Sequence, residues 1–553
     1  MVFARRSTTL LAAIIASCAM VLSLTACTSD NKTVVDGQTT VTSNSAGGVA
    51  VFTPSDGITL NQQTPLNKWA KLVPDLAKAL ADAGFKKGDI DHTTSDSLDK
   101  QSRAIQDFVV DHLSNNTTDD SGIAIAPDNM TLLVAPVVEA DASTRQYGDY
   151  VSQNLSTNDV TDEGATSDGE SSEDDSSKDD SSNTESDSTA SDEQAQAVDR
   201  LVSSLKLAQG TGMHVVLLGN SIEGYKPDAF VKFSDAQTIG KLQAEKMVSK
   251  LKLDKASKDN PKYIEVLLPY TAVDEKGNAN DSTFAQEAFR GIWQVLGSYY
   301  QKGVVESPSG TLDGKSTEND WQAVAYDAAK EGSTAKVLDK RLAKTDGQST
   351  LTRIDGIITM NDYIASEVVK ELDDLGYTTE RWADRGHPGS AADINPQITI
   401  SGIVGNITGK KDLSRDAVPD PIKSPENDNA NDSSSSDDDA DEDTSASDKD
   451  RDSQWPLVTG YGAYVSNIPS IVNGKQWMTG MEDRQTIATD IAQACAKLNK
   501  DEALNSMPSI RNSEVGGVKK IPTISEPLLA VSASNLKSAL IDPGYISLAD
   551  AGL

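Results

Sequence analysis

In three places of the sequence, Asn or Asp follows a short apolar run that is typical of a buried strand. They are Asn361 and Asp362 after residues 356–359, Asn280 and Asp281 after 264–268, and Asn220 after 215–218. The paired donors and acceptors of these side chains can bind two adjacent hydroxyl groups at once. Their chemistry therefore points to recognition of a polar small molecule.

Each of these polar side chains also has a purely structural interpretation. An Asn or Asp at the start of a helix can accept a hydrogen bond from a backbone N–H and cap the helix. We expect Asn361 to contact a ligand and Asp362 to cap a helix that begins near residue 363. Asn280 and Asp281 follow Gly277 and Asn278, a composition that also favours a plain turn.

Aromatic residues could supply the apolar face that packs against the C–H surface of a cyclic ligand. Trp321 begins a predicted helix over 321–329, and core packing is its alternative role. Trp69 shares helical spacing with Leu66 and Leu72, which favours core packing over ligand contact.

The elements that must position these residues alternate along the chain. Apolar runs predict strands at 57–60, 132–135, 215–218, 264–268, 356–359 and 399–404. Amphipathic spacing predicts helices at 66–84, 102–113, 284–301, 321–329 and 363–375. Buried strands interleaved with helices predict an α/β fold of doubly wound parallel sheets. In such sheets ligands bind at the carboxyl ends of the strands.

The N-terminus has the pattern of an export signal. Arg5 and Arg6 precede an apolar run over 10–24, and Leu-Thr-Ala-Cys27 follows. These four residues resemble the bacterial lipobox, in which the Cys thiol receives a lipid and becomes the first residue after cleavage. We expect residues 1–26 to be a lipoprotein signal, Cys27 to anchor the chain on the outer side of the cell membrane, and 27–54 to be a flexible spacer. A soluble signal peptide that happens to end in Cys is the alternative.

The formal charge of -34 comes mostly from two segments. Residues 161–195 carry thirteen Asp or Glu against one Lys, and 425–452 carry twelve against one Lys and one Arg. Segments this polar cannot bury enough surface to fold, so we expect disordered insertions over 156–197 and 425–453. A cation-binding strip would need the ordered spacing of a calcium loop, which both lack. The remaining charge is moderate and makes nucleic acid an unexpected partner.

The motifs of catalysis are missing from the sequence. The four histidines, His92, His112, His214 and His387, show no metal-ligand spacing, and there is no Gly-x-Ser-x-Gly or phosphate-binding loop. Of the three cysteines only Cys495 would remain free in the mature chain, so no disulfide can form there. We expect a protein without enzymatic activity, metal or cofactor.

Four segments together resemble the type I periplasmic binding proteins, in the branch that binds xylose, ribose and galactose. They are 230–248 (FVKFSDAQTIGKLQAEKMV), 355–363 (DGIITMNDY), 458–461 (VTGY) with the following helix, and the tail 529–549. They occur in the family's order over about residues 57–550, and the family includes lipid-anchored members.

The resemblance implies two lobes joined by a hinge of three segments, with a ligand held between them. The first lobe would comprise 57–234 and 476–523, and the second 235–475 and 524–553. The expected function is that of a monomeric, lipid-anchored receptor that captures a sugar and delivers it to the permease and ATPase of an ABC transporter. A surface or signalling lipoprotein whose cleft senses a solute or no longer binds one is the alternative.

The chain departs from the family at several ligand positions. Asn220 and Ser221 stand where the family often has Asp-Arg, and Tyr461 and Gly462 fall at a ligand Asp. A family Lys is replaced by Glu482 or Asp483. We keep Asn220, Tyr461 and Asp483 as candidate ligand contacts. These departures indicate either a different small solute or a cleft that has lost binding.

Overall fold

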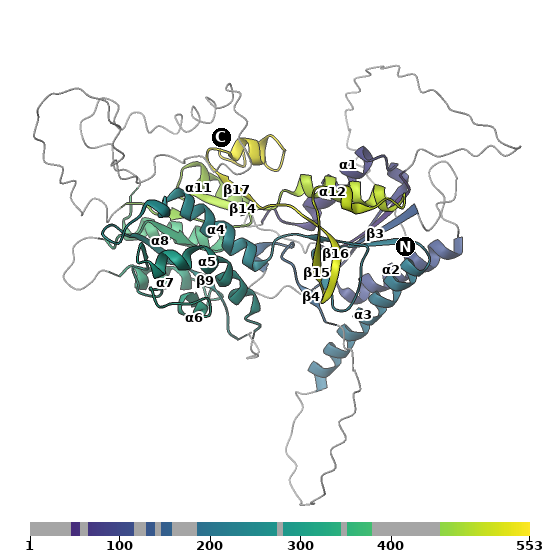
Figure 1. Cartoon of the computed structure of the whole chain (residues 1–553), viewed down its shortest axis with the longest axis horizontal. Coiled ribbons are helices and arrows are strands. Elements are labelled where there is room, and N and C mark those ends of the chain that lie inside the picture. The colour runs from purple at the N-terminus through teal and green to yellow at the C-terminus, as the bar shows by residue number, and fades with distance from the viewer. Residues whose placement is uncertain are drawn as a thin grey trace, which may run out of the picture. The chain divides into compact units, whose positions relative to one another are not determined.

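The computed structural model describes residues 46–55, 65–115, 129–138, 145–156, 185–273, 280–343, 351–378 and 454–553. Within these ranges the chain forms a seven-stranded sheet, a four-stranded sheet and three two-stranded sheets; helices pack around the two larger ones (Figure 1). We call the elements around the seven-stranded sheet the first half and those around the four-stranded sheet the second half.

The first half is built on a seven-stranded sheet in the order β15-β16-β7-β5-β3-β1-β2. Its strands are β1 (Gly48–Pro54), β2 (Ile90–Ser95), β3 (Met130–Val134), β5 (His214–Leu218), β7 (Ala229–Lys232), β15 (Ile510–Val515) and β16 (Val518–Ser525). All neighbours are parallel except the β15–β16 hairpin. The chain goes from β1 to β2 on one side and returns to β3 on the other, so a topological switch point lies between β1 and β3.

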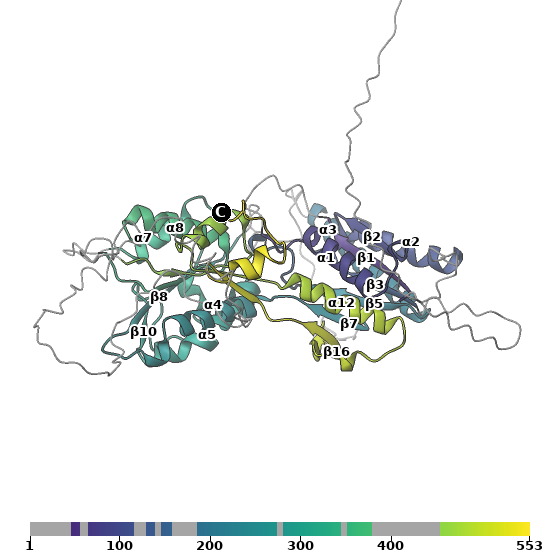
Figure 2. The ribbon, with the colours of Figure 1, turned by 90° about the horizontal axis from the view of Figure 1, so that it is seen from above.

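Helices cover both faces of this sheet, because consecutive residues of its central strands are apolar and their side chains point to opposite faces. Its helices are α1 (Trp69–Asp82), α2 (Leu98–Asn115), α3 (Glu185–Gly210) and α12 (Arg484–Leu498). Val49 and Val51 of β1 join the core under α1 and α12, whereas Ala50 and Phe52 join the core under α2 and α3. The helix α1 lies beside α12 (Figure 2), and α3 lies beside α2 (Figure 1). A sheet buried on both faces explains the continuous apolar runs of its strands.

The second half has a smaller parallel sheet in the order β10-β8-β12-β13. Its strands are β8 (Lys262–Val266), β10 (Val305–Glu306), β12 (Gly356–Ile358) and β13 (Leu457–Val458); β9 (Leu268–Pro269) pairs with β11 (Ala325–Tyr326). Its helices are α4 (Ala236–Lys250), α5 (Thr283–Gln301), α6 (Trp321–Val324), α7 (Ser333–Arg341), α8 (Asp362–Leu375) and α11 (Ile468–Val472). The switch point here lies between β8 and β12.

The chain passes three times between the two halves. It crosses from β7 to α4 over 232–236, from β14 (Met478–Met481) to α12 over 481–484, and from β16 to β17 (Leu529–Ser532) over 525–529. The strands β14 and β17 pair with each other in antiparallel register. The α/β class with parallel sheets is therefore confirmed, and the chain passes between the two halves at these three places.

Four predicted boundaries are wrong. The first lobe, predicted to resume at 476, resumes near 484, because Trp477 and Met478 pack in the core of the second half. Residues 48–54, assigned to the spacer, form the central strand β1, because Val49 to Phe52 are apolar enough to be buried on both faces. Residues 185–197, assigned to a disordered insertion, begin α3, where Ala197, Val198 and Leu201 pack in the core. The helix predicted over 321–329 stops at Val324 and continues as β11.

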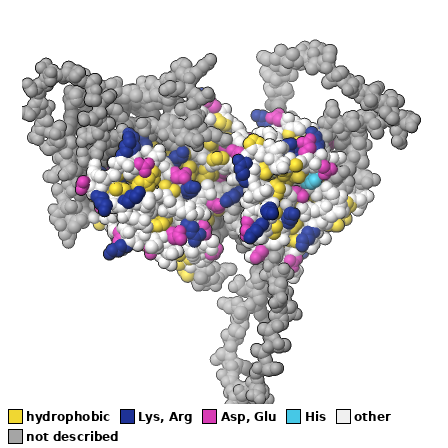
Figure 3. All heavy atoms as spheres, viewed as in Figure 1, with side chains coloured by type: hydrophobic (Ala, Val, Ile, Leu, Met, Phe, Trp, Pro, Cys, Tyr) yellow, Lys and Arg dark blue, Asp and Glu magenta, His cyan; other side chains and the backbone are white. Residues whose placement is uncertain are grey.

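Several other predictions lie outside the described residues. They are the signal and Cys27, the strands at 57–60 and 399–404, residues 157–184, and the insertion at 425–453. Among the described helices, none combines the length and apolar character needed to cross a bilayer. On the face drawn in Figure 3, Lys and Arg side chains lie among Asp and Glu side chains on both halves.

Candidate functional site

Asn361 lies at the carboxyl end of β12, beside the switch point of the second sheet. The preceding residue, Met360, has a left-handed backbone (φ 69°), and its carbonyl accepts a hydrogen bond from Gln243 Nε2 at 3.0 Å. Left-handed backbone is unfavourable for a residue with a side chain and is often found where a functional group must be positioned. This turn sets the direction of the Asn361 side chain.

The Asn361 side chain makes two contacts with different consequences. Its Oδ1 accepts from Ile364 N at 2.9 Å, so Asn361 is the N-cap of α8. Its Nδ2 donates to Gln146 Oε1 at 3.1 Å, and Gln146 lies in the chain segment between β3 and β4 (Asn154–Leu155) of the first half. The expectation that Asp362 caps this helix is therefore wrong, since the cap is Asn361 itself.

Asp362 is fully buried and holds the second half together. Its carboxylate accepts hydrogen bonds from Tyr464 N, Thr479 Oγ1 and Gln476 Nε2 at 2.9, 2.9 and 2.7 Å. Burial raises its pKa to about 6, although these hydrogen bonds lower it. Both oxygens are occupied by partners from the loop after β13 and from β14. Asp362 therefore positions those segments around α8.

Tyr461 is also fully buried, and its hydroxyl connects the crossing segments. It accepts from Asn67 Nδ2 at 2.9 Å, lies 2.5 Å from Ser234 Oγ, and donates to Glu482 Oε1 at 3.1 Å. Glu482 also accepts from Ser234 N at 2.8 Å, and burial raises its pKa to about 7. Ser234 and Glu482 lie in two of the three connections between the halves, so this cluster joins them at the hinge.

The remaining predicted residues lie in two groups. In the second half, Trp321 packs edge-on against Tyr270 at 5.1 Å between ring centroids, and the Tyr270 hydroxyl donates to Asn280 O at 3.1 Å. The neighbouring Asp281 accepts from Thr283 N at the start of α5. The structure thus brings Trp321 and Asn280 together, near the beginning of α5.

The other predicted residues have structural partners in the first half. Trp69 is 2% exposed and packs against Tyr150 and Phe233. Asn220 accepts from Gln153 N and donates to Pro136 O. Asp483 caps α12 by accepting from Thr486 N at 3.2 Å. None of these three contacts Asn361 in the part of the chain that the structure describes.

Sequence reasoning missed Gln146 and Tyr147, which meet the second half at Asn361. The Tyr464 hydroxyl donates to Gln146 O at 2.7 Å, and the ring of Tyr147 lies 4.7 Å from that of Phe284 at the start of α5. Tyr147 is 1% exposed and forms part of the core under α4 and α5. Two tyrosines, Tyr147 and Tyr150, in an otherwise polar stretch were the available signal.

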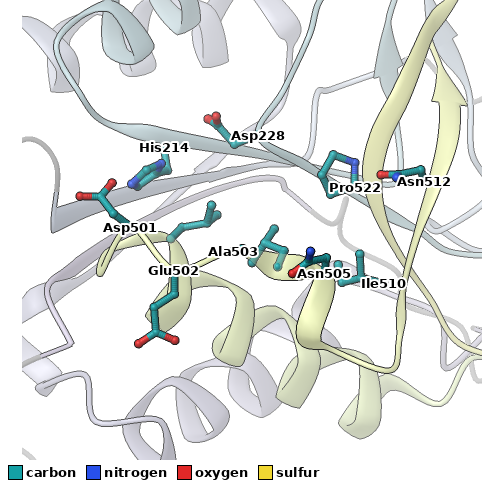
Figure 4. A pocket seen from close by; sticks show the side chains of 11 residues that line it. His214, Asp228, Asp501, Glu502, Ala503, Asn505, Ile510, Asn512 and Pro522 are labelled. Atoms are coloured by element: carbon teal, nitrogen blue, oxygen red, sulfur yellow. The ribbon is translucent and has the colours of Figure 1, made fainter.

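A separate cavity of about 530 Å³ lies in the first half, at the amino end of β5 (Figure 4). His214 and Asp501 lie at one end of it, and Asn512 and Pro522 lie at the other. None of the predicted ligand residues lines it. No group of three His, Cys, Asp or Glu side chains within the described ranges is arranged to hold a metal ion.

Comparison with known proteins gives a structural similarity without a sequence relative. No family model matches the chain, and no curated protein matches it. A solute-binding protein of an ABC transporter from Clostridium phytofermentans with bound β-D-glucose is 16% identical, with a TM-score of 0.43, over 91% of this chain and 99% of that one. A carbohydrate-transporter solute-binding protein from Chloroflexus aurantiacus in complex with D-glucose is 17% identical, with a TM-score of 0.42, over 92% of this chain and 98% of that one. The structure of a periplasmic ribose ABC transporter from Conexibacter woesei is 13% identical, with a TM-score of 0.41, over 90% of this chain and 96% of that one.

Proposed function

We propose that this chain is an extracytoplasmic solute-binding protein of an ABC transporter. It would capture a small sugar, or a solute with similar hydroxyl groups, between its two halves. It would stay at the membrane through a lipid on Cys27 and deliver the solute to a permease.

One observation carries the proposal. Asn361 lies at the carboxyl end of β12, at the switch point of the second sheet, and its Nδ2 donates to Gln146, in the segment that connects β3 and β4 of the first half. Ligands of doubly wound sheets bind at such switch points. A solute held there would contact both halves, and only such a solute can favour their closure about the hinge.

The chemistry around this point suits a sugar. The amide of Asn361 and the hydroxyl of Tyr464 can each bind a solute hydroxyl. The ring of Phe284, at the start of α5, offers an apolar face. A few fixed polar groups among aromatic rings are typical of small-molecule sites.

The transport part of the proposal rests on the N-terminal sequence. A lipid on Cys27 would keep the binding site close to a membrane partner, and the residues before β1 would set the distance and thus the local concentration. The permease and ATPase are the partners that this arrangement suits, and the protein would act as a monomer.

A second candidate function is favoured by a specific contact. Gln146 already accepts from Asn361 Nδ2 and Tyr464 Oη, two donors that a solute would use. A surface or signalling lipoprotein whose cleft no longer binds a solute would have such an arrangement. The two candidates differ in whether any solute stabilises the fold.

A thermal-shift screen of mono- and disaccharides tests the proposal on the chain from residue 28. A solute at 100 times its Kd stabilises the native state by about 2.7 kcal/mol, which raises the melting temperature measurably. At least one sugar should do so. If no sugar shifts the transition, the receptor function is wrong and the signalling function remains.

The matched variants are Asn361→Ser and Asn361→Ala. Serine is a good N-cap but has no amide donor, so Asn361→Ser separates the cap from the ligand contact. We expect both variants to lose the sugar-induced shift, while Asn361→Ser keeps most of the stability of the unliganded chain. A full sugar response in Asn361→Ser would exclude the amide from the site.

A further inference from the structure

The segment 145–151 leaves the first half after β3 and reaches the second half. It comprises a short 3-10 helix (Arg145–Tyr147) and the residues up to Val151. Beyond it the chain returns to the first half through β4 (Asn154–Leu155), which pairs with β6 (Ser221–Ile222). The chain therefore returns to the first half after this segment.

The segment is firmly attached to the first half at Asp149. The Asp149 carboxylate accepts from Lys68 Nζ at 2.8 Å and from Trp69 N at 3.1 Å, and its own N–H donates to Asn67 O at 2.8 Å. Gly148 has a φ of 94°, and a Cβ there would lie 2.6 Å from Asn67 O. Only glycine fits this close approach, so the position of the segment on the first half is well defined.

Its other side contacts the second half with the groups that a solute would offer. The Gln146 side-chain and backbone oxygens accept from Asn361 Nδ2 and Tyr464 Oη. The ring of Tyr147 packs on Phe284 at 4.7 Å and lies 6.3 Å from the ring of Tyr461. Its hydroxyl is buried beside the Asn361 side chain. Two oxygens of Gln146 and the ring of Tyr147 thus contact the polar and aromatic side chains at the switch point.

We propose that the segment 145–151 is an internal ligand of the proposed solute site, which holds the two halves together without solute and must leave before a solute binds. This proposal takes the solute site from the proposed function. The contacts by which the segment holds the two halves together, however, can be tested without a solute. Because a binding-competent state populated at 1–10% weakens apparent affinity 10- to 100-fold, removing the segment's contacts should strengthen solute binding by at least about tenfold.

The first experiment measures the distance between the halves in the absence of solute. Spin labels are placed at the exposed positions Lys78 on α1 and Lys370 on α8 by cysteine substitution, in the chain from residue 28. The native Cys495 is fully buried, and burial raises the pKa of its thiol, so it should not react. The distance distribution is compared between wild type and the double variant Gln146→Ala/Tyr147→Ala.

We expect one narrow distribution for wild type and a broader, shifted distribution for the double variant. Asn154→Ala is the control. Asn154 follows the segment in β4, and its side chain accepts from Ser221 Oγ of the first half, with no side-chain hydrogen bond to the second half within the described residues. Gln146→Ala alone keeps the Tyr147 ring and gives a smaller change if the double variant does not fold. An unchanged distribution in a folded variant, or a broad one in wild type, would overturn the proposal.

The second experiment measures sugar affinity for the same variants and separates the two ideas. Tighter binding by tenfold or more in the double variant is expected. Equal affinity in wild type and variant would refute the internal ligand while the receptor function stands. A variant that opens but binds no sugar would refute the receptor function while the role of the segment in closure stands.

Discussion

Replacing Glu482 by Gln should make the protein more stable at pH 8 but not at pH 4.5. Glu482 is 1% exposed, and its Oε1 accepts from Ser234 N and Tyr461 Oη. Glutamine keeps an oxygen at this position, so both hydrogen bonds can persist. What the substitution removes is the charge, which burial and the nearby Asp235 disfavour.

The size of the effect follows from the pKa of this carboxyl. Burial raises it from 4.5 to about 7, and one pKa unit corresponds to about 1.4 kcal/mol, which gives about 3 kcal/mol. The native state keeps the proton up to about pH 7, whereas the unfolded state releases it near 4.5. The free energy of unfolding therefore falls as the pH rises through this window. Glu482→Gln should regain up to about 3 kcal/mol above pH 7.

Denaturant unfolding at pH 4.5, 6 and 8 checks this prediction. The difference between variant and wild type should be small at pH 4.5 and grow with pH; Asp362, with a pKa of about 6, contributes equally to both and cancels. Glu502→Gln is the control, because the exposed Glu502 pairs with Lys497, which lowers its pKa. It should bring no gain at pH 8. A Glu482→Gln effect that is equal at all three pH values would refute the reasoning.

Three further predictions concern the helix cap, the core and the lipid. Asn361→Ala should destabilise the chain by about 1 kcal/mol through loss of the cap, and Asn361→Ser by much less, as measured by denaturant unfolding. Trp69→Ala should cost about 3–5 kcal/mol and lower the melting temperature whether or not a sugar is present, because Trp69 packs in the core of the first half. Labelled fatty acid should be incorporated into the wild-type protein and not into Cys27→Ala; no incorporation into the wild type would exclude the lipid anchor.

Strong local patterns were sufficient to predict most elements of the fold. The helix α5, predicted over 284–301, spans Thr283–Gln301, because its apolar spacing agrees with the face it buries. The strand β1 was missed because the composition of residues 28–54 as a whole suggested a spacer and concealed four apolar residues. The start of α3 was missed because its first turns share the acidic composition of the preceding residues.

Of the two residues that meet at the candidate site, only Asn361 could be predicted from the sequence. Asn361 was found because it follows a recognisable strand. Its partner Gln146 lies 215 residues away in sequence and in a stretch without a periodic pattern. Such a contact depends on how two sheets are connected, which local spacing does not encode. The cap also fell one residue earlier than expected, because the turn at Met360 places Asn361 at the helix start.

The three connections between the halves also determine the order in which the chain can fold. The core of the first half needs Ile487 and Ile491 of α12 and Ile524 of β16, more than 250 residues after the end of β7. The first half therefore cannot be completed until the chain beyond residue 524 is available. Such distant pairings slow folding and leave apolar surface exposed meanwhile. Truncation after residue 483 should therefore destabilise the whole first half, because it removes α12 from the core and β15 and β16 from the sheet.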